Sequence, residues 1–183
     1  ELRSKVSKFA GALKAQGANK GDRVIIYMPM IPEAVVAMLA CARIGAIHSV
    51  VFGGFASNEL ASRIDDSKAK LLVTASCGFE PGRTVEYKPL VDEAIKQAQH
   101  KISKMILFQR KGHEVKLNAP KEISWDEAYA NANNTDCVEM KSNEFAYILY
   151  TSGTTGTPKG IVRDIGGHIV APKWTMKNIY NID

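Results

Sequence analysis

The residues best suited to chemistry lie together in one segment, positions 151–159, which reads Thr-Ser-Gly-Thr-Thr-Gly-Thr-Pro-Lys. It follows Phe145–Tyr150, an apolar run typical of a strand. Glycines let the backbone bend so that successive N–H groups can surround an anion, and the hydroxyl groups add further donors. Lys159 adds a full positive charge. The segment therefore predicts a loop that holds a polyphosphate.

Two familiar phosphate-binding motifs do not describe this loop. A Walker A loop needs Gly before its Lys and Ser or Thr after it, whereas Pro158 precedes Lys159 and Gly160 follows it. The Gly-x-Gly-x-x-Gly spacing of dinucleotide-binding folds is also absent from the segment. A plain polar turn is a poor alternative, because hydroxyl residues and glycines are too concentrated here. The phosphate-binding residues that we expect are Thr151, Ser152, Gly153, Thr154, Thr155, Gly156, Thr157 and Lys159.

Helical and strand patterns alternate along the chain and must position this loop. Apolar runs predict strands over 22–28, 46–52, 71–75, 105–108, 145–150 and 161–162. Apolar residues at helical spacing predict helices over 2–13, 33–44 and 89–98, one that follows Ser57 and carries Leu60, Ala61 and Ile64, and one from 124. Ser57 is the expected N-cap of one helix, and Ser124 with Glu127 matches a capping box.

Such alternation predicts an α/β fold of parallel βαβ units with helices packed on the sheet. We expect 76–88 to be a loop and 110–143 to be an irregular connection. The tail from Gly166 reads as a weak helix crossed by Pro172.

Composition excludes several classes of protein. The 183 residues are 45% apolar and 23% charged, which is ordinary for a globular chain. The net charge of +5 (24 minus 19) comes without a basic run laced with aromatics, so nucleic acid is not an expected partner. No apolar stretch approaches the ~20 residues that a membrane helix needs.

The cysteines and histidines carry no metal or disulfide signature. Cys41, Cys77 and Cys137 are odd in number and widely spaced, which predicts unpaired thiols in a reducing compartment. The histidines are scattered without a His-x-x-x-His pair, so we expect no metal site built from protein ligands. His48 lies within a strand and is expected to be an ordinary core or edge residue.

The loop segment is similar to the signature loop of the AMP-forming acyl-CoA synthetases, in the adenylate-forming superfamily. The stretches 21–24, 45–55 and 63–67 resemble the acetyl-CoA and propionyl-CoA synthetase branch of that family. The stretch 160–167 resembles the propionate-type members more than the acetate type. The resemblance covers essentially the whole chain, which is well under half of such an enzyme.

The resemblance implies that 1–183 is a fragment of the large N-terminal AMP-binding domain. The C-terminal domain, which carries the adenylation lysine, is then absent, so we expect no catalytic residue here and no turnover by the piece alone. The family's reaction has two steps: a carboxylate attacks the α-phosphate of ATP, and the CoA thiol then displaces AMP. ATP with magnesium, coenzyme A and a short-chain carboxylate, most naturally propionate, are the implied ligands.

A second implied site would contact the adenosine 3′-phosphate end of CoA. The matching positions are Phe52, Gly53 and Gly54, followed by Glu80, Pro81, Gly82 and Arg83. Arg83 could grip a phosphate bidentately. The acetate-type enzymes carry a second arginine at the position of Glu80, and a carboxylate there cannot bind phosphate directly.

Other functions stay open on the sequence alone. The chain could be a non-catalytic nucleotide- or CoA-binding fragment, or part of another adenylate-forming acid ligase. The expected compartment is the cytoplasm or the mitochondrial matrix, and the oligomeric state is not indicated.

Overall fold

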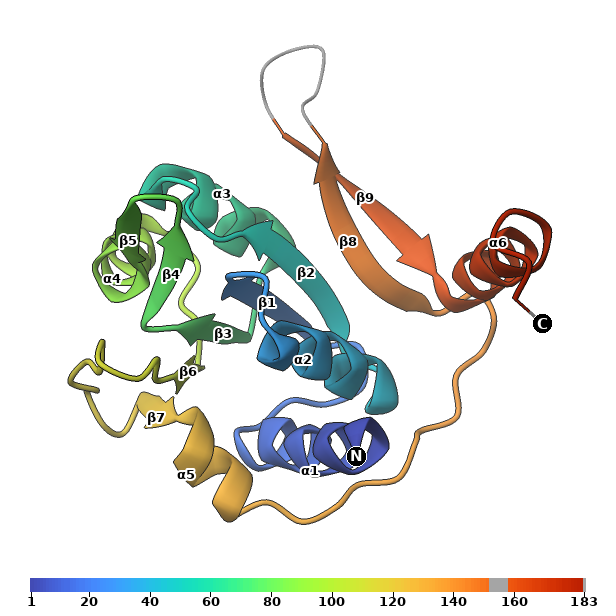
Figure 1. The fold of residues 1–183 in the computed structure, drawn as a ribbon, viewed down its shortest axis with the longest axis horizontal. Coiled ribbons are helices and arrows are strands. Elements are labelled where there is room, and N and C mark those ends of the chain that lie inside the picture. The colour runs from blue at the N-terminus through green and yellow to red at the C-terminus, as the bar shows by residue number, and fades with distance from the viewer. Residues whose placement is uncertain (152–157, 183) are drawn as a thin grey trace.

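A mostly parallel sheet organises the chain. The computed structural model describes residues 1–151 and 158–182. Within them, a seven-stranded sheet has the order β7-β6-β3-β1-β2-β8-β9 (Figure 1). Its strands are β1 (Arg23–Met28), β2 (Ile47–Phe52), β3 (Leu71–Ala75), β6 (Lys104–Phe108), β7 (Glu122–Ser124), β8 (Phe145–Thr151) and β9 (Lys159–Asp164).

The predicted parallel arrangement is confirmed for all strands of this sheet except β9. Strands β1, β2, β3, β6, β7 and β8 pair in parallel, whereas β9 pairs antiparallel with β8. The reason is the length of the connection. Parallel neighbours need a crossover of a dozen or more residues, and only residues 152–158 join β8 to β9. The expected short strand at 161–162 is therefore the middle of a longer hairpin strand.

Helices cover both faces of the sheet, as predicted (Figure 1). Helices α1 (Leu2–Ala15) and α2 (Pro32–Arg43) pack together on one face, with α5 (Trp125–Ala130) beside α1. Helices α3 (Ser57–Ser67) and α4 (Tyr87–Gln97) pack together on the other face. Every residue of β3 is buried, and so are five of the six in β1. Central parallel strands are covered on both faces, which explains their continuous apolar runs.

The ends of two helices test the capping predictions. The Ser124 hydroxyl accepts a hydrogen bond from the Glu127 amide at 3.1 Å, which confirms the predicted cap of α5. Trp125 then stacks on Phe9 of α1 with ring centroids 3.6 Å apart. The prediction that Ser57 caps α3 was wrong, because Ala56 is the N-cap residue and no side chain caps the helix.

The loop expected over 76–88 is the clearest error in the predicted fold. The chain forms a hairpin there from β4 (Cys77–Glu80) and β5 (Arg83–Glu86), and α4 begins at Tyr87. Pro81-Gly82 makes a two-residue turn, with Gly82 at a φ of 76° that a side chain would strain. The polar 110–143 region likewise contains the short edge strand β7.

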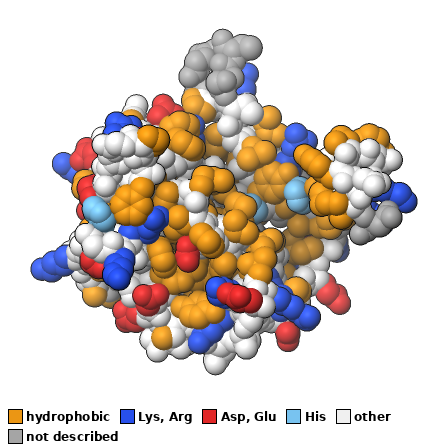
Figure 2. All heavy atoms as spheres, viewed as in Figure 1, with side chains coloured by type: hydrophobic (Ala, Val, Ile, Leu, Met, Phe, Trp, Pro, Cys, Tyr) orange, Lys and Arg blue, Asp and Glu red, His pale blue; other side chains and the backbone are white. Residues whose placement is uncertain are grey.

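The last helix, α6 (Ile165–Asn178), is regular despite Pro172, and no residue in it is buried. It leaves large apolar side chains exposed, such as Trp174 and Val170. Hydrophobic side chains also gather on the face of the molecule shown in Figure 2. Met30 is 96% exposed and Phe52 62% exposed. A surface this apolar is typical of an interface.

Candidate functional site

The predicted site residues converge on one edge of the sheet. Strands β2 and β3 lie on opposite sides of β1, so the strand order reverses around β1. In open α/β sheets, ligands bind outside the carboxyl ends of the strands at such a reversal. The turn at 52–55 follows β2, the β4–β5 hairpin follows β3, and the Gly-rich segment follows β8. The topology therefore gathers all three candidate segments.

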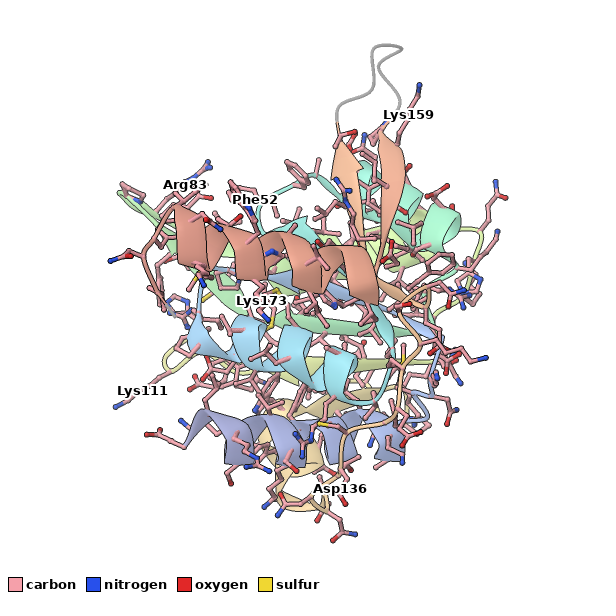
Figure 3. All side chains as sticks on the ribbon, turned by 90° about the vertical axis from the view of Figure 1, so that its right-hand side faces the viewer. Phe52, Arg83, Lys111, Asp136, Lys159 and Lys173 are labelled. Atoms are coloured by element: carbon pink, nitrogen blue, oxygen red, sulfur yellow. The ribbon has the colours of Figure 1, made fainter. Side chains whose placement is uncertain are left out.

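The base of the phosphate loop is held by the β8–β9 ladder. Thr151 pairs with Lys159, and Tyr150 pairs with Gly160. Lys159 is exposed and points along the hairpin toward its tip (Figure 3). The structure thus brings together the first and last of the predicted phosphate-binding residues. The others lie outside the described residues: Ser152, Gly153, Thr154, Thr155, Gly156 and Thr157.

Tyr150 fixes this base to helix α3. Its hydroxyl donates a hydrogen bond to Asp66 Oδ2 at 2.6 Å. Burial and this hydrogen bond raise the pKa of Tyr150 well above its ordinary value, so the phenol stays a protonated donor. Gly160 lies against the same pair: a Cβ there would sit 3.1 Å from the Tyr150 ring and 3.3 Å from the Asp66 carboxylate. Close packing therefore fixes the base of the hairpin, at Tyr150 and Gly160, against α3.

The turn after β2 is fixed just as closely. A Cβ on Gly53 would lie 2.3 Å from the Tyr87 hydroxyl oxygen and 2.9 Å from the Met28 carbonyl oxygen. The Gly54 amide donates to the Tyr27 hydroxyl at 3.2 Å, and that hydroxyl donates to the Phe55 carbonyl at 2.8 Å. Glycine at position 53 is therefore required by close approach, as expected for a backbone that contacts its neighbours directly.

A cavity of about 280 Å³ opens beside this turn. It lies where the carboxyl ends of β1, β2, β3 and β6 meet, and its walls are mostly apolar. The lining residues that matter here are Met28, Phe52, Gly53, Phe79, Glu80 and Arg110. Of the seven predicted CoA-binding residues, the structure thus places Phe52, Gly53 and Glu80 at the cavity, and Gly54 next to Glu80.

Arg83 forms an ion pair with a nearby carboxylate. Its Nη2 and Nε atoms lie 2.6 Å and 2.8 Å from Glu80 Oε2, and its side chain is 71% exposed. Pro81 and Gly82 form the turn between the two partners. The residues that line the cavity do not include 81–83. Phe52 and Arg83 nevertheless lie along the same edge in Figure 3. Arg83 was predicted to bind phosphate, but in the structure its charge is neutralised by the carboxylate of Glu80.

Sequence reasoning missed Arg110. Its guanidinium lies over the Phe79 ring, 4.6 Å from the centroid, and it lines the cavity. Among the described residues, no carboxylate oxygen lies within 4 Å of it. The sequence contains a signal that could have identified Arg110. It closely follows the apolar strand 104–108, so it must lie near the carboxyl edge of the sheet.

Metal and membrane features are not indicated by the described residues. In 1–151 and 158–182, no three His, Cys, Asp or Glu side chains cluster to hold an ion. No helix in the same ranges is long and apolar enough to cross a membrane. His48 packs near Tyr147, with ring centroids 5.5 Å apart, and burial lowers its pKa to about 4. It is a half-buried histidine that stays neutral at physiological pH.

A family comparison covers nearly the whole chain. The model of the family described as "AMP-binding enzyme" matches residues 1–181. The human "acyl-CoA synthetase short-chain family member 3, mitochondrial" is 56% identical over 183 residues, which is all of this chain and 27% of that protein. The Vibrio cholerae "acetyl-coenzyme A synthetase" is 49% identical over 99% of this chain and 28% of that protein. The chain therefore spans about 27% of the length of the curated relatives it matches.

A solved structure agrees with the sequence comparison. The "acetoacetyl-CoA synthetase from Streptomyces lividans" superposes with a TM-score of 0.89 at 27% sequence identity. The superposition covers 99% of this chain and 27% of that one. The mostly parallel sheet is thus the fold found within the N-terminal domain of an adenylate-forming enzyme.

Proposed function

We propose a function on the premise that the chain belongs to the AMP-binding enzyme family: the protein that carries it is an AMP-forming short-chain acyl-CoA synthetase. In the first step, a carboxylate oxygen attacks the α-phosphorus of ATP and pyrophosphate leaves. In the second step, the CoA sulfur attacks the acyl carbon and AMP leaves. One observation carries the proposal: the match to this family covers nearly the whole chain, including the edge of the sheet where the candidate site lies.

The β8–β9 hairpin supports the first step. Thr151 and Lys159 face each other at its base, and the intervening sequence is rich in Gly, Ser and Thr. Backbone N–H groups, hydroxyls and one ammonium group suit the β- and γ-phosphates of ATP. ATP would enter as its magnesium complex, and the ion would offset part of the phosphate charge. The residues at 151–157 and Lys159 are proposed to hold the pyrophosphate portion while the α-phosphorus reacts.

The cavity at the carboxyl edge supports a CoA site. Its apolar wall, formed by residues such as Phe52 and Phe79, suits a flat adenine ring, and Arg110 supplies a cation beside it. Gly53 and Gly54 bring backbone close to this space. Glu80 lines the cavity and holds Arg83, which does not line it, so Arg83 can meet a phosphate only by leaving its carboxylate partner.

The acyl substrate is proposed to be short, and propionate in particular. Relatives named for short-chain and acetyl substrates support the short chain length. The support for propionate is the resemblance of 160–167 to propionate-type members. The alternatives, a non-catalytic binding module or another acid ligase, are not favoured by any observation on the described residues.

The domain assignment is part of the proposal. Residues 1–183 are proposed to form a piece of the N-terminal AMP-binding domain, with the catalytic lysine elsewhere. Two observations support it: the chain spans about 27% of its relatives, and α6 buries none of its residues. A helix with exposed Ile169, Val170 and Trp174 needs further structure to cover it.

The thiols fit a reducing compartment, the cytoplasm or the mitochondrial matrix. Cys41 and Cys77 are buried and Cys137 is exposed, and all three are unpaired. Burial raises the pKa of Cys41 to about 12, which makes it unreactive. Several relatives are named mitochondrial, which agrees with the matrix.

Pyrophosphate exchange tests the proposal. The full-length protein is given ATP·Mg²⁺, labelled pyrophosphate and one acid at a time: acetate, propionate, butyrate or octanoate. Acids are compared by kcat/KM, which reports discrimination in the transition state. We expect exchange with propionate at the head of the series, and thioester formation only when CoA is added. A preference for octanoate would refute the short-chain assignment, and no exchange with any acid would refute adenylation.

A further inference from the structure

A buried arginine lies between the two proposed substrate sites. Arg63 is on α3, and its side chain is 8% exposed. Its Nη1 donates to the Glu59 carbonyl oxygen and to Glu59 Oε2, both at 2.7 Å. This carboxylate balances the charge, as a buried cation requires. The flat guanidinium group also makes contacts outside its own helix.

Two aromatic rings flank the guanidinium. Its Cζ atom lies 5.1 Å from the centroid of the Phe55 ring and 5.2 Å from that of the Tyr150 ring. Both distances are within the range of a cation–π interaction, which strengthens when the cation is desolvated. A planar, delocalised cation can stack against aromatic faces in a way that an ammonium group cannot. Arg63 therefore joins two rings that come from segments 95 positions apart in the sequence.

Each ring lies next to the residues of one of the two proposed sites. Phe55 ends the turn after β2; it packs on Phe52 at 5.7 Å, and its carbonyl accepts the Tyr27 hydroxyl hydrogen bond. Tyr150 precedes Thr151 at the base of the phosphate loop and is held by Asp66. Strands β2 and β8 are neighbours that pair at His48 and Tyr147, and farther along the chain the Phe55 and Tyr150 rings both lie against Arg63. Among the described residues, the Arg63 side chain thus contacts a ring from each segment.

We propose that Arg63 is a positioning residue that couples the turn at 52–55 to the base of the phosphate loop, so that a change in the Phe55 ring alters how the loop base is held. The inference rests on the proposed function for the identity of the two substrates. The physical coupling itself is argued only from the contacts of Arg63 with Phe55 and Tyr150, whatever the substrates are.

The coupling is isolated by the half-reaction that lacks CoA. Pyrophosphate exchange by the full-length protein uses ATP and propionate, so a substitution on the CoA side has no direct ligand to disturb. With Arg63 present, Phe55→Leu is expected to raise KM for ATP about three- to tenfold, the range of one desolvated cation–π contact. In the Arg63→Met background, which keeps an apolar stem, Phe55→Leu is expected to leave KM for ATP unchanged. Arg63→Lys, which keeps the charge but not the flat face, should resemble Arg63→Met.

Lys88→Met is the matched control. Lys88 is on α4, is also 8% exposed on its side chain, and pairs with Asp92 four positions away. It lies in neither proposed site. The variant should lower the melting temperature as Arg63→Met does, with KM for ATP unaffected. An equal rise in KM for both variants would show that Arg63 acts only through stability, which would overturn the inference.

A second measurement separates this inference from the proposed function. Amide hydrogen exchange is followed at 148–151 and 159–162, the base of the hairpin. Phe55→Leu should accelerate exchange there in the Arg63 protein and not in the Arg63→Met protein. If the wild-type protein shows no pyrophosphate exchange, the proposed function fails while this result still decides the coupling. The same effect of Phe55→Leu in both backgrounds, or no effect in either, would overturn the coupling.

Discussion

Arg83 and Glu80 close the turn of the β4–β5 hairpin with an ion pair, in which Nη2 and Oε2 are 2.6 Å apart. The pair is solvent-exposed on the arginine side, so it contributes little to stability. Its consequence is functional: the carboxylate competes with any phosphate for the guanidinium group.

Glu80→Gln should therefore improve the use of CoA. An exposed pair of this kind is worth about 0.2–1 kcal/mol, so release of Arg83 should lower KM for CoA by up to about fivefold. Dephospho-CoA, which lacks the 3′-phosphate, should show no such gain. The measurement is the thioester-forming step with each thiol, and Arg83→Met is the control that should cancel the gain. An identical change for both thiols would place Glu80 outside phosphate recognition.

Gly53→Ala should destabilise the protein. The added methyl group would meet the Tyr87 hydroxyl at 2.3 Å and the Met28 carbonyl oxygen at 2.9 Å, and backbone yields poorly. Overpacking of this kind costs about 1–3 kcal/mol in the free energy of unfolding, measured by urea denaturation. In a Tyr87→Phe background the cost should be smaller, because the closest of the three clashing atoms is gone, although the ring carbon Cζ of residue 87, at 2.8 Å, remains. An undiminished cost there would mean that the Met28 carbonyl and the ring carbon of residue 87, and not the Tyr87 hydroxyl, set the requirement for glycine.

Acid should weaken the fold through His48. Burial, with a smaller effect of His168, lowers the pKa of His48 from 6.5 to about 4. Between these two values the unfolded chain binds the proton and the folded chain does not, so the free energy of unfolding falls as the pH drops from 6.5 toward 4. His48→Asn should flatten this dependence. The check is urea denaturation of both proteins at pH 7 and pH 5; parallel losses in the two would show that other groups cause the acid sensitivity.

The order of helices and strands could largely be predicted from sequence, because buried parallel strands are short apolar runs and the covering helices are periodic. Leu71–Ala75 and Arg23–Met28 show this plainly, since almost every residue in them is buried. The hairpin at 77–86 was missed because the segment expected to be a loop contains Gly78 and Pro81-Gly82, and a two-residue turn between short strands has the same composition as a loop.

The candidate site could be predicted only where its residues are adjacent in the sequence. The phosphate loop and the turn at 52–54 are continuous segments, so their composition shows them. Tyr150 reaches Arg63 and Asp66 of α3 because β2 and β8 are neighbouring strands. Asp66 and Tyr150 are 84 positions apart, so no local sequence pattern predicts their contact. The Glu80–Arg83 pair needed the hairpin geometry as well, since a loop would not fix two side chains on one side of a turn.

The central claim is that the β8–β9 hairpin holds the phosphates of ATP, and Lys159→Ala tests it most directly. The two half-reactions of the full-length protein are compared in wild type and variant, after melting temperatures show that both are folded. Loss of one charge-stabilising donor is expected to cost about 2–4 kcal/mol in the ATP-dependent step, roughly a 30- to 1000-fold fall in kcat/KM for ATP. Thioester formation from synthetic propionyl-AMP and CoA, which involves no β- or γ-phosphate, should change little. Equal losses in the two half-reactions, or none in the first, would contradict the account.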